Sequence, residues 1–285
     1  MKNEDPISPE SLPPSRMFPQ PSIRPLRYPV LLCHGYGTIA GFITPSPLHK
    51  VCMYMRKHGV CAFAPNVVPY GRIEVRSAEW LKILGMILKE TGSRKVNIVA
   101  YSMGGLDTRY MIHKHQLQDV VASLTTVSSP NSGSSLADFT LSTPGALRKQ
   151  FMKFTDLVGN RVYPSIPSDA RGALEQLTRS YISGTFSKHV KDAPGVRYFS
   201  FSAACGKGTE EPINSSLMLF NRLIFEKEGI NDGFVSRESA IYGDHIRTTS
   251  LSHLEQIKVG LMREHKKEWN IFWDDVMDLL VDAGF

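Results

Sequence analysis

The chain has 285 residues, of which 42% are hydrophobic, 21% charged and 9% aromatic, an ordinary composition for a globular protein. It contains no run of 18 apolar residues, so we expect no transmembrane segment. The net charge of +6 is scattered along the chain. Its densest basic run, at 263–268, also contains acidic residues, which favours a solvated helix face over nucleic-acid binding.

Residues 1–27 are expected to form a proline-rich arm ahead of the folded domain. Eight of the chain's 18 prolines lie within residues 1–29, and proline suits neither a helix interior nor a strand ladder. The first residues, Met1-Lys2-Asn3-Glu4-Asp5, are not followed by an apolar segment, so no secretory signal is expected. This predicts a cytoplasmic protein, or a secreted one if a signal was removed or is non-standard.

Strand-like and helical segments alternate over the single domain predicted at 28–285. Strands are expected at 28–33, 60–65, 95–101, 121–128 and 196–202. Helices are expected at 47–57, 77–89, 106–115 and 268–281, with Ser77 as the cap of the second. Such alternation predicts an α/β fold with a mostly parallel sheet covered by helices on both faces.

The block at about 131–190 interrupts this alternation. It carries helical patterns at 147–157 and 170–178 but no clear strand. We therefore expect an inserted helical cap or lid.

Ser102 lies where a predicted strand meets a predicted helix, in the pattern Ala-x-Ser-x-Gly. A tight strand-to-helix turn strains the serine backbone, and small neighbours such as Ala100, Gly104 and Gly105 relieve the crowding. The turn exposes the hydroxyl and leaves the N–H of Met103 at a helix N-terminus, where it can stabilise an oxyanion. Ser102 is thus a candidate nucleophile, and Met103 a candidate backbone donor.

A second oxyanion donor is expected from the loop after an earlier strand. His34-Gly35 follows the strand-like run at 29–33, and this position makes the N–H of Tyr36 the candidate. An ordinary turn with a glycine is the alternative.

An acid and then a histidine should follow such a serine along the chain. Asp232, before a glycine and a short strand-like run, is the leading acid, with Asp244 as its competitor. His245 and His253 both lie in the region before the last helix, where the base should be. The residues alone leave this choice open.

Four segments together resemble the bacterial triacylglycerol lipases of the α/β-hydrolase superfamily. They are "VLLCHGYG", "AYSMGGLDTRY", "VSSPNSGSSLADF" and "INDGFVSRESAIYGDHIRTTSLSHLEQI", in the family's order. Asn131 replaces a histidine that this family carries in the third segment. The resemblance implies the α/β-hydrolase fold with a helical lid, and it implies the triad Ser102, Asp232 and His253.

The resemblance also implies a lipase or esterase that acts on acylglycerols or similar apolar esters, possibly at a lipid–water interface. No cofactor is needed for this chemistry. A structural calcium ion is common in the family, and here Glu255 takes one ligand position, with Glu210 or Glu211 as loose candidates for another. An acyltransferase, phospholipase or thioesterase would use the same triad. A catalytically silent binding protein is the non-enzyme alternative, but its expected damage to the triad is not seen.

Overall fold

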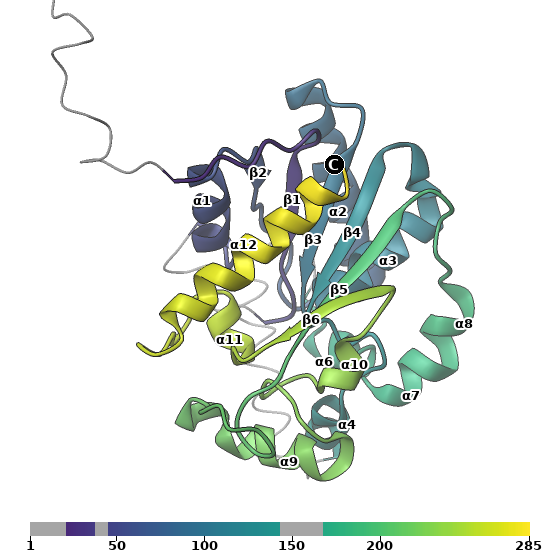
Figure 1. Cartoon of the computed structure of the whole chain (residues 1–285). Coiled ribbons are helices and arrows are strands. Elements are labelled where there is room, and N and C mark those ends of the chain that lie inside the picture. The colour runs from purple at the N-terminus through teal and green to yellow at the C-terminus, as the bar shows by residue number, and fades with distance from the viewer. Residues whose placement is uncertain (1–20, 38–44, 143–167) are drawn as a thin grey trace, which may run out of the picture.

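The structure, a computed structural model, describes residues 21–37, 45–142 and 168–285 (Figure 1). Its centre is one sheet of six parallel strands in the order β2-β1-β3-β4-β5-β6. The strands are β1 (Val30–Cys33), β2 (Ala62–Phe63), β3 (Val96–Tyr101), β4 (Val121–Val127), β5 (Arg197–Ala203) and β6 (Asp244–Thr249). The predicted parallel sheet is confirmed. Five strands were expected, and β6 is an additional edge strand.

The side chains of the inner strands alternate between two apolar layers, because successive residues of a strand face opposite sides of its sheet. In β1, Val30 and Leu32 join one layer, while Leu31 and Cys33 join the other. All four are fully buried. The inner strands therefore lie between helices on both faces.

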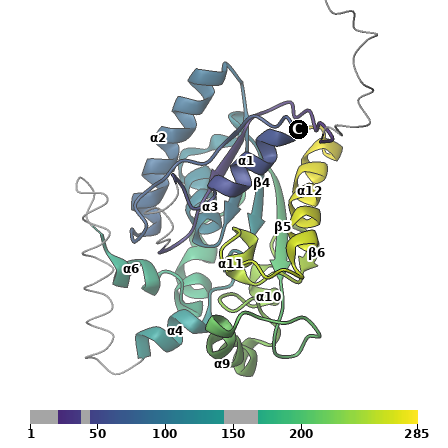
Figure 2. The same cartoon turned by 90° about the vertical axis from the view of Figure 1, so that its left-hand side faces the viewer.

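Helices α1 (His49–Lys57) and α12 (Lys266–Asp282) cover the first face, and α2 (Ile73–Thr91) and α3 (Met103–His115) cover the second (Figures 1 and 2). The buried residues of α12 recur at helical spacing, as expected for a helix that packs one side onto a sheet. They are Trp269, Phe272, Trp273, Val276, Met277 and Leu280. The prediction of covering helices is confirmed.

The expected cap at Ser77 is wrong, because α2 begins one turn earlier with Arg72 in the N-cap position. Ser77 is buried inside the helix, where its hydroxyl donates to the carbonyl of Asp107 on α3 at 2.6 Å. Ile73 and Arg76 are also buried, and their packing favours the earlier start.

In the described part of the block at 131–190, every regular element is a helix or helical turn. Its elements are α4 (Ser135–Ser142), α6 (Ala170–Glu175), α7 (Arg179–Tyr181), the π-helical turn η5 (Ile182–Phe186) and α8 (Ser187–His189). The helix expected at 147–157 lies outside the described residues. Both views show α4 and α6 below the sheet (Figures 1 and 2). Whether the block moves as a lid stays a prediction, as does the extent of the N-terminal arm, of which only residues 21–27 are described.

The remaining elements lie in the connections between the larger ones. They are the short turns η4 (Leu117–Asp119) and η6 (Ser215–Leu217) and the helices α9 (Met218–Glu228), α10 (Arg237–Ala240) and α11 (His253–Gln256). The strand-like run expected after Gly233 is a loop, with an isolated bridge between Asn231 and Ser236. Within the described ranges, none of the helices has the length and apolar character that crossing a membrane requires.

Candidate active site

Ser102 occupies the sharp turn between β3 and α3. Its φ of 55° and ψ of −133° lie in a region that non-glycine residues rarely adopt. The turn is held by the N–H of Ser102, which donates to the carbonyl of Val127 on β4 at 2.9 Å. Ser102 is partly exposed although its neighbours Tyr101 and Met103 are buried. The turn thus presents Oγ above the sheet, as a nucleophile requires.

Two glycines let α3 begin directly beside the strands. A Cβ on Gly104 would lie 2.6 Å from the carbonyl oxygen of Cys33, at the end of β1. A Cβ on Gly105 would lie 2.2 Å from the hydroxyl of Ser129, after β4. The small residues expected at these positions are therefore required by close packing of the helix N-terminus against two strand ends.

Gly35 brings the loop after β1 against the serine. A Cβ at this position would lie 2.6 Å from Cβ of Ser102 and 3.0 Å from the backbone nitrogen of Met103. The next residue, Tyr36, packs its ring edge against Tyr70, and its hydroxyl donates to the carbonyl of Ala170 at 3.2 Å. The loop with Tyr36 and the N-terminus of α3 with Met103 therefore adjoin the same serine, as the oxyanion-hole prediction requires.

Arg76 on α2, which the sequence did not single out, holds this loop from behind. Its guanidinium donates to the carbonyls of His34 and Val68, at 2.6 Å each, and to the carboxylate of Asp107 at 2.7 Å. Arg76 and Asp107 are both fully buried. Burial raises the pKa of Asp107 to about 6, against the lowering effect of Arg76. The guanidinium thus ties the oxyanion loop to α2 and α3.

Asp232 is fully buried in the loop between α9 and α10. Its Oδ1 accepts hydrogen bonds from the N–H groups of Phe234 (3.0 Å) and Val235 (2.8 Å). Its Oδ2 accepts from the Gln256 amide at 3.2 Å and lies 2.7 Å from Nδ1 of His253. This carboxylate is fixed in place by its acceptor bonds and is aimed at the imidazole.

His253 lies between the carboxylate and the serine. It is the first residue of α11, and its N–H donates to the carbonyl of Asp232 at 2.9 Å. Because Nδ1 faces a carboxylate, the ring proton belongs on Nδ1, and Nε2 is then an acceptor for the Ser102 hydroxyl at 3.0 Å. A carboxylate, an imidazole and a hydroxyl in this sequence can deprotonate the serine as it attacks an electrophile.

Two aromatic rings pack against the His253 imidazole. Phe234 stacks on it with ring centroids 5.1 Å apart, and the ring of Tyr101 lies 4.8 Å away. The Tyr101 hydroxyl also donates to the carbonyl of His253 at 2.7 Å. Tyr101 is buried, and its contacts orient the histidine. Sequence reasoning missed the roles of Phe234 and Gln256, for which the sequence carries no local signal.

The competing residues lie elsewhere. His245 is on β6, in place of the expected loop, and its Nε2 is 3.0 Å from the hydroxyl of Ser202. Asp244 is exposed and pairs with Arg197 at 3.2 Å. Neither contacts Ser102 or His253 in any hydrogen bond of the described residues.

Glu255, the proposed calcium ligand, is buried in a network of protein donors. Oε2 accepts from the N–H and hydroxyl of Ser252, and Oε1 accepts from the N–H of Met262 and lies 2.9 Å from Nδ1 of His265. Nε2 of that histidine faces Glu211 at 3.8 Å, so the imidazole lies between the two carboxylates. No cluster of three or more His, Cys, Asp or Glu side chains in the described ranges has a metal-binding arrangement. Ser252 and Glu255 form a capping box at the start of α11. Calcium binding by Glu255 stays a prediction.

Comparison with known proteins gives one family and a set of relatives. Residues 28–180 match the model of the α/β-hydrolase fold family. A triacylglycerol lipase of Pseudomonas fragi is 28% identical over 262 residues, which cover 81% of this chain and 88% of that protein. A triacylglycerol lipase of Vibrio cholerae is 27% identical, covering 84% of this chain and 82% of that protein.

Solved structures share the fold at lower sequence identity. The mature lipase of Bacillus licheniformis superposes with a TM-score of 0.65 at 22% identity, covering 92% of this chain and 95% of that one. A carboxyl esterase of metagenomic origin gives a TM-score of 0.70 at 16% identity, covering 93% and 78%.

Proposed function

This chain belongs to the α/β-hydrolase fold family, and from that premise we propose that it cleaves acyl esters through an acyl-enzyme formed on Ser102. Its similarity to bacterial triacylglycerol lipases makes it a carboxylic-ester hydrolase. The observation that carries the proposal is the unbroken chain of contacts from Asp232 through His253 to Ser102, with distances of 2.7 and 3.0 Å.

In the first half-reaction, Oγ of Ser102 attacks the ester carbonyl carbon while Nε2 of His253 takes the hydroxyl proton. Asp232 stabilises the resulting imidazolium and keeps the ring oriented. The N–H groups of Met103 and Tyr36 are proposed to donate to the oxyanion of the tetrahedral intermediate. Each such donor is worth about 10²- to 10³-fold in rate.

The intermediate collapses when the C–O bond to the alcohol breaks and His253 gives its proton to the leaving oxygen. An acyl group then remains on Ser102. In the second half-reaction, His253 deprotonates a water molecule, which attacks the acyl carbonyl. The carboxylic acid leaves and the proton returns to Oγ of Ser102, so the enzyme is restored.

Replacement of the nucleophile tests this proposal. We expect Ser102→Ala to lose p-nitrophenyl butyrate hydrolysis almost completely, while Ser183→Ala, at an exposed serine on η5, keeps the wild-type rate. Wild-type protein should release a burst of p-nitrophenol equal to the enzyme concentration if deacylation is the slower step. Full activity in Ser102→Ala would overturn the proposal.

The natural substrate is proposed to be an acylglycerol or a similar apolar ester, presented at a lipid surface. Exposed apolar side chains support this: Phe139 on α4 is 42% exposed, and Met218 and Leu219 on α9 are 41% and 65% exposed. Helices α4 and α9 pack together, and both lie below the sheet in Figures 1 and 2. Such a surface can enter a lipid interface without a transmembrane segment.

Polar replacement of this surface separates lipid docking from chemistry. We expect Leu219→Ser to lower the rate on emulsified tributyrin several-fold and to leave the rate on soluble p-nitrophenyl acetate unchanged. Met86→Ser is the matched control, because Met86 on α2 is 66% exposed. Equal loss on both substrates, or equal loss in the control, would contradict lipid docking through α9.

A further inference from the structure

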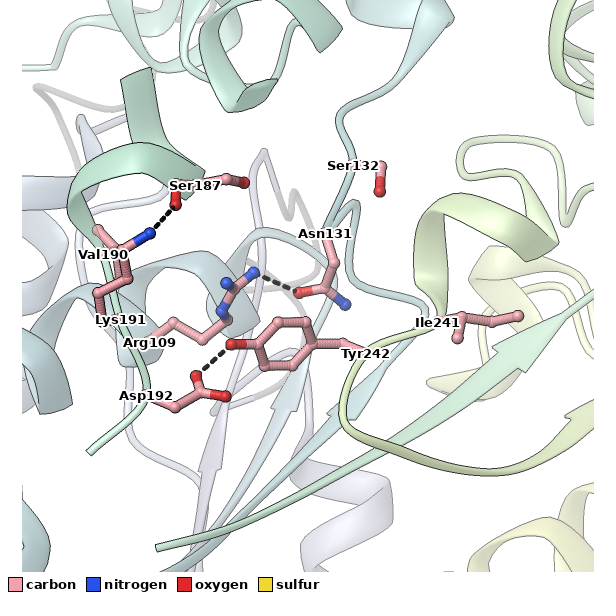
Figure 3. A pocket seen from close by; sticks show the side chains of 9 residues that line it. All are labelled: Arg109, Asn131, Ser132, Ser187, Val190, Lys191, Asp192, Ile241 and Tyr242. Atoms are coloured by element: carbon pink, nitrogen blue, oxygen red, sulfur yellow. Dashed lines mark hydrogen bonds between the residues drawn. The ribbon is translucent and has the colours of Figure 1, made fainter. Parts of the chain in front are cut away.

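Arg109, on α3, lies in the wall of a surface cavity of about 360 Å³ that the proposed reaction does not use (Figure 3). Other residues in the wall come from the loop after β4, from the segment around α8 and from the loop before β6. They include Asn131, Ser187, Lys191, Asp192 and Tyr242. Neither Ser102 nor His253 belongs to the lining. The volume is at the lower end of the roughly 300–1,000 Å³ typical of small-molecule sites.

The Arg109 guanidinium is buried and forms no direct salt bridge among the described residues. The residue is 5% exposed, and Asp192 acts on its charge without a direct contact. Nη1 donates to Oδ1 of Asn131 at 3.1 Å, while the buried Nε has no acceptor. Burial lowers the pKa of Arg109, and the nearby Tyr242 and Asp192 offset this lowering only in part.

Two aromatic rings pack against the guanidinium. Its central carbon lies 3.6 Å from the centroid of the Tyr242 ring and 5.2 Å from that of Phe186. Phe186 ends the π-helical turn η5, a rare conformation that is found frequently at functional sites. Cation–π contacts stabilise the charge but accept no N–H of the guanidinium, whose Nε has no acceptor.

The rest of the wall also favours an anion. Lys191 adds a second positive charge, and its ammonium donates to the carbonyl of Ser187 at 2.9 Å. Asp192 is the single acidic residue in the lining, and its carboxylate accepts from the Tyr242 hydroxyl (Figure 3). Ser132 and Ser187 add hydroxyl groups. The cavity therefore has two cations, one acid and several polar donors.

We propose that this cavity binds the phosphate group of a small molecule, with the Arg109 guanidinium as its principal partner. A planar guanidinium donates two parallel hydrogen bonds to an oxyanion, and a nearby ammonium and hydroxyl groups suit the remaining oxygens of a tetrahedral phosphate. Free phosphate and a phosphate monoester present the same chemistry. The cavity volume leaves room for the organic part of an ester.

Calorimetric titration of the full chain tests the proposal, with orthophosphate and glycerol 3-phosphate as probes at constant ionic strength. We expect saturable binding to wild-type protein and at least tenfold weaker binding to Arg109→Gln. Arg171→Gln, at an exposed arginine on α6, should bind like the wild type. Tighter binding of glycerol 3-phosphate than of orthophosphate would identify a phosphate ester as the ligand, and equal or weaker binding would identify the free ion.

Two surface variants keep the test independent of any folding defect in Arg109→Gln. Asp192→Asn removes a negative charge that repels phosphate but keeps an acceptor for the Tyr242 hydroxyl. Phosphate should therefore bind this variant several-fold more tightly. Lys191→Gln should bind several-fold more weakly, and both variants should hydrolyse p-nitrophenyl butyrate at the wild-type rate. The proposal is overturned if wild-type protein shows no saturable binding, or if Asp192→Asn and Lys191→Gln bind phosphate as the wild type does.

Discussion

At Ser102 the main chain adopts a conformation that costs about 1–3 kcal/mol for a non-glycine residue, so the surroundings must impose it. The hydrogen bond to Val127 and the close approach of Gly35, Gly104 and Gly105 impose it here. The strain places Oγ where Nε2 of His253 can accept its proton. At the scale of single residues, the site therefore depends on small side chains as much as on reactive ones.

Gly35→Ala should damage catalysis more than folding. The added Cβ would meet Cβ of Ser102 at 2.6 Å and push apart the loop and the turn that carry the two oxyanion donors. A displacement of about 1 Å at such a site costs about 10²-fold in rate. We expect that loss in kcat/KM for p-nitrophenyl butyrate.

Gly85→Ala on α2 is the matched control for this substitution, because a Cβ there meets nothing within 4 Å. It should keep full activity and raise the free energy of unfolding by about 0.4–1 kcal/mol. An active Gly35→Ala variant would show that the loop does not need this close approach.

Asp232→Asn should lower kcat by about 10⁴-fold with little change in KM, because an amide favours the wrong tautomer of the histidine. The measurement is steady-state hydrolysis of a soluble ester, with circular dichroism to verify the fold. Asp244→Asn, at the exposed competitor, should retain wild-type kcat. Comparable losses in the two variants would remove Asp232 from the proposed triad.

Ser102, Asp232 and His253 were predictable because their local patterns occur in a fixed order along the chain. From the residues alone, His245 and His253 were both candidates for the base, and the family resemblance favoured His253. Arg76, Tyr101 and Phe234 support the site through contacts between distant segments or through ring packing. Such contacts leave no spacing pattern, so their roles are visible only in three dimensions.

Among the elements, α2 has the least obvious connection to the site. Arg76 extends from it to the carbonyls of His34 and Val68 and to the carboxylate of Asp107 on α3. These contacts lie behind the loop that carries Tyr36. The helix thus acts as a support for the oxyanion loop.

Arg76→Lys keeps the charge but cannot satisfy three separated acceptors, each of which costs about 1–3 kcal/mol when left buried and unpaired. We expect a lower free energy of unfolding in urea and a kcat that falls about tenfold, with KM nearly unchanged, as an oxyanion donor shifts. Arg171→Lys, at an exposed arginine, should change neither quantity. A destabilised variant with wild-type kcat would limit Arg76 to a structural role.

Element prediction failed where the local pattern was weak. Strand β6 contains Asp244, His245 and Arg247, and it lies at the sheet edge with mostly half-exposed residues, so it lacks the apolar pattern of the inner strands. The start of α2 was placed too late because Arg76 is a charged residue that is nevertheless buried. Long inner elements such as β3 and α12 were predicted closely because their apolar residues follow strand or helix spacing.

For the whole molecule, His34 should make stability depend on pH. Burial, with a smaller effect from Arg76, lowers its pKa from 6.5 to about 3, and its ring accepts the N–H of Val67 at 3.2 Å. Between these two pH values the folded state binds fewer protons than the unfolded state. The contribution of neutral His34 to the free energy of unfolding is therefore fully present above pH 6.5 and is lost as the pH falls. At pH 4 the loss from this residue is about 3 kcal/mol.

Urea unfolding at pH 7, 5.5 and 4.5 measures this effect. The wild type should lose more stability on acidification than His34→Gln, whereas His115→Gln, at an exposed histidine, should follow the wild type. Parallel curves for the wild type and His34→Gln would contradict the assignment of a neutral, buried His34.

The most direct measurement of the central claim is mass-spectrometric mapping of the residue that a fluorophosphonate modifies. Such a reagent phosphonylates a serine that a neighbouring base activates. We expect one adduct per chain, on the peptide that carries Ser102, with no adduct in Ser102→Ala and much slower labelling in His253→Gln. An adduct on a different residue, or undiminished labelling of Ser102→Ala, would show that Ser102 is not the nucleophile.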